Sequence, residues 1–133
     1  MIKYTLGEVE ASGLRKVLYT DDFKELYKDT YYEDLKEWGY IESEKNLSQD
    51  GMCVIHGNAR VYGNARVYGD AMVYGDACVC DNACVYGYAC VCGNARVSQG
   101  FTTGMCIRTT EQWYEYQYKK AELQAKWDKE DTE

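Results

Sequence analysis

The residues of this chain that could carry chemistry are one histidine and seven cysteines. An imidazole can act as a general base on a hydroxyl or an amine, and cysteine thiolates can bind zinc. The histidine is His56, so a site with three histidine ligands cannot be built. Five cysteines lie close enough in sequence to suggest a zinc cluster: Cys78, Cys80, Cys84, Cys90 and Cys92. Whether either group can act depends on the backbone that positions it.

That backbone is set by a repeat of six residues, which occupies residues 51–98. Its copies are GMCVIH, GNARVY, GNARVY, GDAMVY, GDACVC, DNACVY, GYACVC and GNARVS. Positions three and five are almost always Ala and Val, and residues two apart in a strand point to the same side. Gly followed by Asn or Asp favours a tight corner. We therefore expect each hexad to form a short strand and a corner, and successive hexads to wind into a solenoid around these Ala and Val side chains.

The consensus G-[ND]-A-x-V-x resembles the hexapeptide repeat of left-handed parallel β-helices, in which three hexads make one triangular coil. It is most similar to YdcK-like proteins and to a subgroup found in phage and mobile-element proteins. Residues 38–51 also resemble the lead-in G-[YF]-I-E-x-E-x-N-L-S-x-x-G of that subgroup. The resemblance implies a mainly β fold, a short left-handed parallel β-helix of about 2.7 coils, with an N-terminal α/β cap and a C-terminal helix. It implies no settled activity.

The segments on either side of the repeats are expected to cap its open ends, because a solenoid exposes unpaired strands there. We divide the chain into an N-terminal hairpin and helical cap, the β-helix, and a linker with a C-terminal helix, at residues 1–50, 51–98 and 99–133. The hairpin is predicted from strands at 2–6 and 14–19.

A helix is predicted to follow the hairpin, with Thr20 as its N-cap. Phe23, Leu26 and Tyr27 share one face of that helix. A second short helix is predicted to carry Leu35 and Trp38.

The C-terminal helix is predicted over about 110–129. It would begin at a capping box in which Thr109 and Gln112 satisfy each other's backbone donors. The helix carries two apolar stripes, and docking on a small solenoid requires only one. We therefore expect a homo-oligomer, a dimer or a trimer, with residues 113–127 in the contact; a single wide buried face is the alternative.

Stacking of the hexads predicts where the cysteines lie. Positions four and six point outward on three faces, and the clustered cysteines are spread over all three: Cys90 and Cys92 on the first, Cys78 and Cys80 on the second, Cys84 on the third. Four thiolates on different faces cannot converge at the Zn–S distance of about 2.3 Å. We expect no metal site and no cofactor.

The same stacking places His56 outward, at position six of the first hexad and beside the N-terminal cap. Many hexapeptide-repeat proteins are acyltransferases that use a histidine as general base, so an acyltransferase is the alternative that the resemblance implies. No long loop interrupts the repeats to form an acceptor pocket. We expect His56 to be a surface or packing residue and the protein not to be an enzyme.

Tyrosine and arginine dominate the outward positions, and both are enriched in protein interfaces. The candidate interaction residues are Arg60, Tyr62, Arg66, Tyr68, Tyr74 and Tyr86 on the repeats, and Trp113, Tyr116 and Trp127 on the C-terminal helix. Tyrosine is also simply a good strand residue on a half-exposed surface, which is the other interpretation.

The charge of the chain favours a basic partner. Its formal net charge is −7, and residues 1–50 alone carry 12 acids against 7 bases. Nucleic acids and anionic membranes require clustered Lys and Arg, so we expect the chain to bind neither directly. With no apolar leader or membrane-spanning stretch, and with an odd number of cysteines, we predict a cytoplasmic protein with reduced thiols.

These observations predict a non-catalytic protein-interaction module. The resemblance to phage proteins implies an inhibitor of a host defence system, similar to an anti-CRISPR, whose acidic surfaces bind a basic host protein; the compartment is then the host cytoplasm. A small-molecule sponge that binds nucleotides through Arg60, Arg66 or Arg96 is a further alternative.

Overall fold

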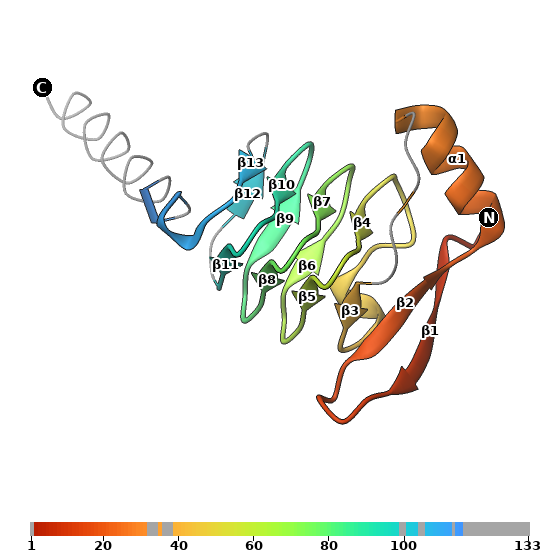
Figure 1. Ribbon diagram of the computed structural model, residues 1–133, viewed down its shortest axis with the longest axis horizontal. Coiled ribbons are helices and arrows are strands. Elements are labelled where there is room, and N and C mark those ends of the chain that lie inside the picture. The colour runs from red at the N-terminus through yellow and green to blue at the C-terminus, as the bar shows by residue number, and fades with distance from the viewer. Residues whose placement is uncertain are drawn as a thin grey trace, which may run out of the picture.

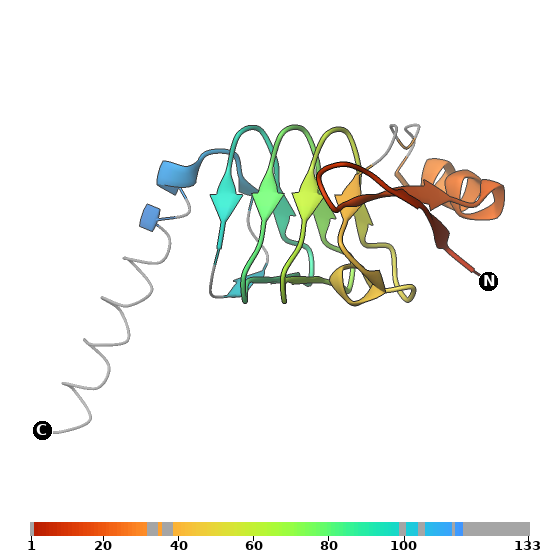
Figure 2. The same ribbon diagram turned by 90° about the horizontal axis from the view of Figure 1, so that it is seen from below.

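The computed structural model describes residues 2–31, 35, 39–98, 101–103, 106–112 and 114–115. It is a parallel β-solenoid of about three coils, preceded by a hairpin and a helix (Figure 1). The coils stack in one direction, with the hairpin and helix at one end of the stack (Figure 2). The predicted fold, mainly β with an N-terminal α/β cap, is confirmed.

A hairpin and one helix form the N-terminal block, residues 2–31. Strands β1 (Tyr4–Val9) and β2 (Arg15–Tyr19) are antiparallel, as the sequence predicted. Helix α1 (Asp21–Tyr31) begins where the Thr20 hydroxyl accepts a hydrogen bond from the Phe23 amide at 3.3 Å, so the predicted N-cap is also confirmed. Phe23 and Tyr27 are buried.

Leu26 and Leu35 depart from their predicted environments. Leu26 was placed on the inner face of the helix, but it is 42% exposed, so that face is narrower than expected. Leu35 belongs to no helix and packs against the core, and Trp38 lies outside the described residues.

Three parallel ladders form the walls of the solenoid. The first ladder contains β4 (Val54–Ile55), β7 (Met72–Val73), β10 (Cys90–Val91) and β13 (Cys106–Ile107). The second contains β3 (Tyr40–Ile41), β5 (Arg60–Val61), β8 (Cys78–Val79) and β11 (Arg96–Val97), and the third β6 (Arg66–Val67), β9 (Cys84–Tyr86) and β12 (Phe101–Thr103). Each hexad pairs with the third hexad that follows it, as Val61 does with Val79, which confirms the predicted faces.

The coils extend beyond the eight hexads on both sides. Before them, Ile41 of β3 pairs with Val61 and Leu47 forms a bridge to Val67, on either side of a 3-10 turn, η1 (Glu44–Asn46). We call residues 39–50 the lead-in coil. After Ser98, β12 and β13 continue two of the ladders in a segment that the sequence assigned to a linker.

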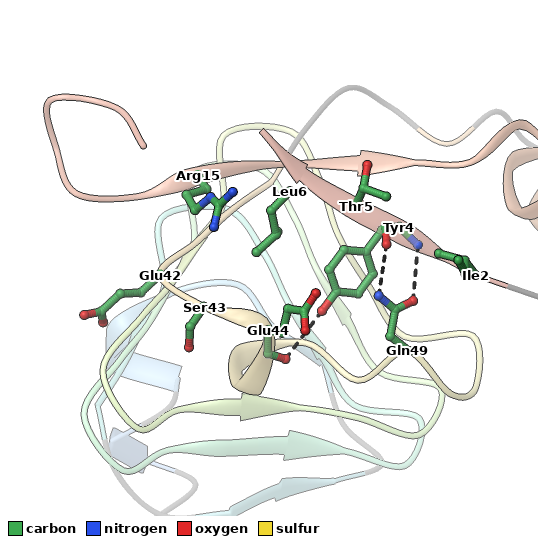
Figure 3. Close-up of a pocket in the computed structure, with 9 residues that line it drawn as sticks. All are labelled: Ile2, Tyr4, Thr5, Leu6, Arg15, Glu42, Ser43, Glu44 and Gln49. Atoms are coloured by element: carbon green, nitrogen blue, oxygen red, sulfur yellow. Dashed lines mark hydrogen bonds between the residues drawn. The ribbon is translucent and has the colours of Figure 1, made fainter. Parts of the chain in front are cut away.

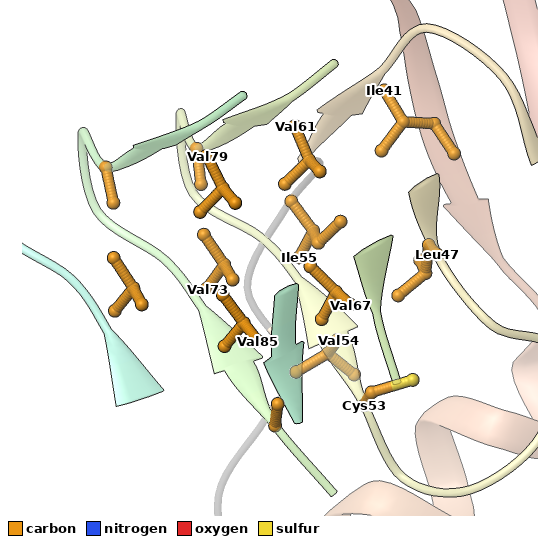
Figure 4. Close-up of a cluster of buried hydrophobic side chains, with 14 of the residues drawn as sticks. Ile41, Leu47, Cys53, Val54, Ile55, Val61, Val67, Val73, Val79 and Val85 are labelled. Carbon is orange, nitrogen blue, oxygen red and sulfur yellow. The ribbon is translucent and has the colours of Figure 1, made fainter. Parts of the chain in front are cut away.

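The inner faces of the coils form the core, part of which is drawn in Figure 4. The Ala and Val side chains at positions three and five of the hexads are essentially inaccessible to solvent, as predicted: Ala59, Val61, Ala65, Val67, Ala71, Val73, Ala77, Val79, Ala83, Val85, Ala89 and Val91. Ile41 and Leu47 of the lead-in coil continue the same columns. Ala and Val therefore fill the middle of the stack, and the larger Ile41, Leu47 and Ile55 fill its N-terminal end.

The corners require a left-handed backbone. Gly69 has φ of 68°, and a Cβ atom on it would lie 3.0 Å from the amide nitrogen of Gly87 in the next coil. Both the backbone conformation and the close approach therefore favour glycine. Among the described residues, Asp81 is the one non-glycine in this conformation, with φ of 56°.

Two buried tyrosines of the N-terminal block close the open end of the solenoid. The Tyr19 hydroxyl donates to the carbonyl of Ile55 at 2.6 Å and accepts from the amide of the same residue at 2.7 Å. The Tyr4 hydroxyl donates to the carbonyl of Leu47 at 2.5 Å. Burial raises the pKa of both phenols, which keeps them protonated as donors.

A buried lysine joins the same cap. Lys3 is 1% exposed, and its Nζ donates to the carbonyl of Cys53 at 2.8 Å and to the Cys53 Sγ at 3.1 Å. The amine also lies 5.6 Å from the centre of the Phe23 ring. Burial lowers the pKa of Lys3 and raises the pKa of the Cys53 thiol. The first residues of the chain are therefore tied to the first complete hexad.

At the far end, side chains again replace missing strand partners. The Thr110 hydroxyl accepts from the amide of Arg96 at 3.1 Å. Thr109 caps the turn that follows, because its hydroxyl accepts from the Gln112 amide at 3.1 Å. The Gln112 side-chain Oε1 accepts from the amide of Arg108 at 2.8 Å, whereas the predicted capping box requires the amide of Thr109 as the donor.

The hydroxyl of Tyr19 should be essential for stability. Tyr19→Phe leaves the buried Ile55 amide without an acceptor, which costs about 1–3 kcal/mol of unfolding free energy. Tyr68→Phe is the matched control, since Tyr68 is 36% exposed and should change stability by less than about 0.5 kcal/mol. Urea unfolding followed by circular dichroism measures both. Equal stability of the two variants would contradict the capping role.

Candidate interaction surfaces

The third face, formed by β6, β9 and β12, presents an aromatic column. Tyr68 and Tyr86 come from successive coils, and their rings stack 5.1 Å apart at an angle of 4°. Arg66 is exposed beside them, and Cys84 is half-buried. The structure thus brings together three of the predicted interaction residues: Arg66, Tyr68 and Tyr86. A flat tyrosine stack flanked by arginine is suited to packing against another protein.

The second face, formed by β3, β5, β8 and β11, is less aromatic. Arg60 is exposed at the start of β5. Tyr62 is half-buried, and the Cys78 Sγ lies 3.4 Å from its hydroxyl oxygen. The Tyr62 hydroxyl therefore already has a partner within its own chain, which makes Tyr62 less available to a second protein than the exposed Tyr68.

The first face, formed by β4, β7, β10 and β13, is the most covered. Val54, at an outward position, is fully buried. His56 was expected to be a surface or packing residue; it is 8% exposed, and its ring stacks on that of Tyr74 with the ring centres 5.2 Å apart, so it is a packing residue. Tyr74 is half-buried. An imidazole in this position does not open onto any of the four grooves described for the chain.

The cysteines lie as the stacking rule placed them. Cys78, Cys84 and Cys90, at position four, are half-buried, whereas Cys80 and Cys92, at position six, are buried. Cys53 is also a buried free thiol. Within the described residues, no three His, Cys, Asp or Glu side chains come close enough to hold a metal ion.

The arginines proposed for nucleotide binding do not converge. Arg60 and Arg96 start strands that lie two coils apart in the second ladder, and Arg66 belongs to the third ladder. A site between subunits would be required to bring them to one phosphate. Of the C-terminal candidates, Trp113, Tyr116 and Trp127 lie outside the described residues, as does most of the predicted contact at 113–127.

An open groove of about 610 Å³ lies between the hairpin and the lead-in coil (Figure 3). The hairpin side is formed by Ile2, Tyr4, Thr5, Leu6 and Arg15, and the lead-in side by Glu42, Ser43, Glu44 and Gln49. The two sides are joined where the Gln49 amide bonds the backbone of Tyr4. The groove is therefore built by two segments that both pack against the solenoid core.

Acidic side chains dominate the rim of this groove. Glu42 and Glu44 line it, and Glu8 is exposed further along β1. Among the nearby cations, Lys3 is buried, and the Arg15 Nε donates to the carbonyl of Gly7 at 2.6 Å. Glu44 is therefore the most available charge here, because the Glu42 Oε2 accepts from the amide of Gly63 at 2.8 Å and the exposed Lys45 donates to the Asn64 Oδ1 at 3.2 Å.

The sequence prediction missed these acids and one aromatic residue. The acids belong to segments without the six-residue pattern, so their position followed from no motif. Tyr88 is 80% exposed at a corner, where most copies have Asn or Asp. A tyrosine in place of Asn or Asp at this position could have indicated an exposed aromatic side chain, because a corner residue points away from the coil.

Comparison with known proteins supports the repeat architecture. Residues 65–81 match the YdcK beta solenoid repeat, a stretch shorter than one coil. No curated protein and no solved structure matches the chain. The chain is thus similar to the YdcK repeat in its hexads, and the comparison extends no further. Among the described residues, no helix is long and apolar enough to cross a membrane.

Thiol labelling should report the three faces directly. Iodoacetamide should modify the half-buried Cys78, Cys84 and Cys90 of the native protein before it modifies Cys80 and Cys92, because buried thiols are inaccessible to the reagent. Mass spectrometry of proteolytic peptides measures the order, and labelling in urea is the control for intrinsic reactivity. Faster modification of Cys80 or Cys92 would contradict the described packing.

Proposed function

We propose that this chain is a non-catalytic protein-interaction module whose partner presents a basic surface. The observation that carries the proposal is the placement of charge at the N-terminal end of the solenoid. Glu8, Glu10, Glu42 and Glu44 are all exposed there. The neutral repeats hold this acidic end on a rigid support, which reduces the entropy lost on binding.

Two further observations support an interaction role over catalysis. The stacked Tyr68 and Tyr86 rings provide a second surface of the kind enriched in interfaces. The chain's one histidine is 8% exposed and stacked on Tyr74, whereas a general base must reach within hydrogen-bond distance of the proton it removes. The geometry of His56 thus argues against the acyltransferase alternative.

Resemblance and charge support a proposal for the class of partner. The G-N-A-x-V-x hexads resemble those of phage and mobile-element proteins, which suggests a host protein as the target. Defence nucleases bind nucleic acid in basic channels, and an acidic protein can occupy such a channel by electrostatic complementarity. We therefore propose an inhibitor of a host defence system, similar to an anti-CRISPR, that competes with nucleic acid.

The test is competition for a CRISPR effector nuclease. The purified protein should displace DNA from at least one effector of a panel, and the affinity should fall steeply as salt is raised. Glu8→Lys with Glu44→Lys should weaken binding by about ten-fold or more, because repulsion replaces attraction at both positions. Fluorescence anisotropy of labelled DNA measures the displacement.

Glu25→Lys with Asp29→Lys is the matched control, since it changes net charge equally on the exposed side of α1. If both double substitutions weaken binding to the effector equally, the effect is one of net charge alone. If no effector of the panel is bound, the defence target is wrong. Acetyl transfer from acetyl-CoA by the purified protein is measured as well. If His56→Ala reduces its rate by about 10²-fold or more, the protein is an enzyme and the interaction role is wrong.

A further inference from the structure

Strand β1 is the last strand of its six-stranded sheet, and no strand within the described residues pairs with its outer edge. The side chain of Gln49 occupies one position of that edge. Its Oε1 accepts from the amide of Tyr4 at 3.3 Å, and its Nε2 donates to the carbonyl of Tyr4 at 2.9 Å. This pair of bonds imitates one step of a β-ladder, and shows that the Tyr4 backbone faces away from β2.

The next free position on this edge is Leu6. Backbone groups two residues apart in a strand point to the same edge, so the amide and carbonyl of Leu6 also face outward. The pairing with β2 agrees, because Val17 lies opposite Leu6 and directs its amide to Gly39 on the other side, at 2.9 Å. The edge therefore continues beyond Gln49 at Leu6. After Leu6 the pairing with β2 shifts register, and the Gly7 carbonyl accepts from the Arg15 Nε at 2.6 Å.

This edge borders the groove that Figure 3 shows, and the groove is acidic. Leu6 and Tyr4 supply apolar side chains on one side, while Glu42 and Glu44 supply carboxylates on the other. A second copy of this chain would bring the same exposed acids, Glu8 and Glu44, to the groove, and this like charge disfavours self-pairing. Charge thus selects a basic occupant rather than another β1.

We propose that the edge of β1 at Leu6, beside Gln49, binds an extended basic segment of the partner protein, which adds a short strand to the sheet. The inference rests on the proposed function and names its binding site. Main-chain hydrogen bonds to the Leu6 amide and carbonyl supply affinity. Lysine or arginine at alternate positions of the segment faces Glu42 and Glu44, which supplies specificity.

A short fluorescent peptide of alternating lysine and valine is the probe, and anisotropy measures its affinity for the full chain. Leu6→Pro removes the outward amide and should weaken binding by about ten-fold or more. Leu6→Ala is the control, because it shortens the same side chain and keeps the amide. Circular dichroism and urea unfolding check that both variants are folded.

The same peptide with N-methyl groups on alternate residues tests backbone pairing on the unmodified protein. It keeps every charge but loses the donors, and should bind at least about ten-fold more weakly. Equal binding of the two peptides, or no binding of the parent peptide, would overturn the inference. The proposed function is tested separately, by the displacement of labelled DNA from the effector. Displacement without peptide binding at β1 would mean that the chain binds the effector through another surface.

Discussion

A short solenoid depends on closing the open side of its first coil. Each strand of this chain contributes so few residues that the core holds little beyond Ala and Val, and the ladder must be complete to stabilise it. Along the repeats, every coil supplies hydrogen-bond partners to the next. At the open N-terminal side of the stack this neighbour is missing, and side chains of the N-terminal block take its place, beside one backbone bond from the Gly39 amide to the Ile55 carbonyl. Tyr19 satisfies both backbone groups of Ile55, Tyr4 satisfies Leu47, and Lys3 satisfies Cys53.

The closing of that coil also creates the surface with which we associate function. Because Tyr4 packs inward against Leu47, its strand is fixed beside the lead-in coil, and the groove between them has rigid walls. The acids on those walls are held at one end of a neutral stack. By contrast, the tyrosine column of the third face follows from the repeat itself, since identical positions in successive coils superimpose. The chain thus has one surface generated by periodicity and another generated by its cap.

The features that periodicity controls could be predicted from the sequence. The hexads predicted the buried Ala and Val columns and the distribution of the cysteines. Two strand-like segments predicted the hairpin, and a capping signal predicted the role of Thr20. The lead-in coil could not be predicted in this way, because the step from Ile41 to Val61 is two residues longer than the steps that follow. The burial of His56 depends on a stack with Tyr74 from the next coil. Lys3 is buried only because distant residues enclose it, and no local pattern signals that.

The N-terminal block and the solenoid fold as one unit, because the Tyr19 hydroxyl bonds both backbone groups of Ile55. Hydrogen exchange measured by NMR on the unmodified protein tests this at a single atom, the Ile55 amide. We expect the Ile55 amide to exchange as slowly as the amide of Val79 in the middle of the stack, because both hydrogens exchange only when the whole protein unfolds. An Ile55 amide that exchanges rapidly while Val79 stays protected would contradict the account, since the cap would then open independently of the coils.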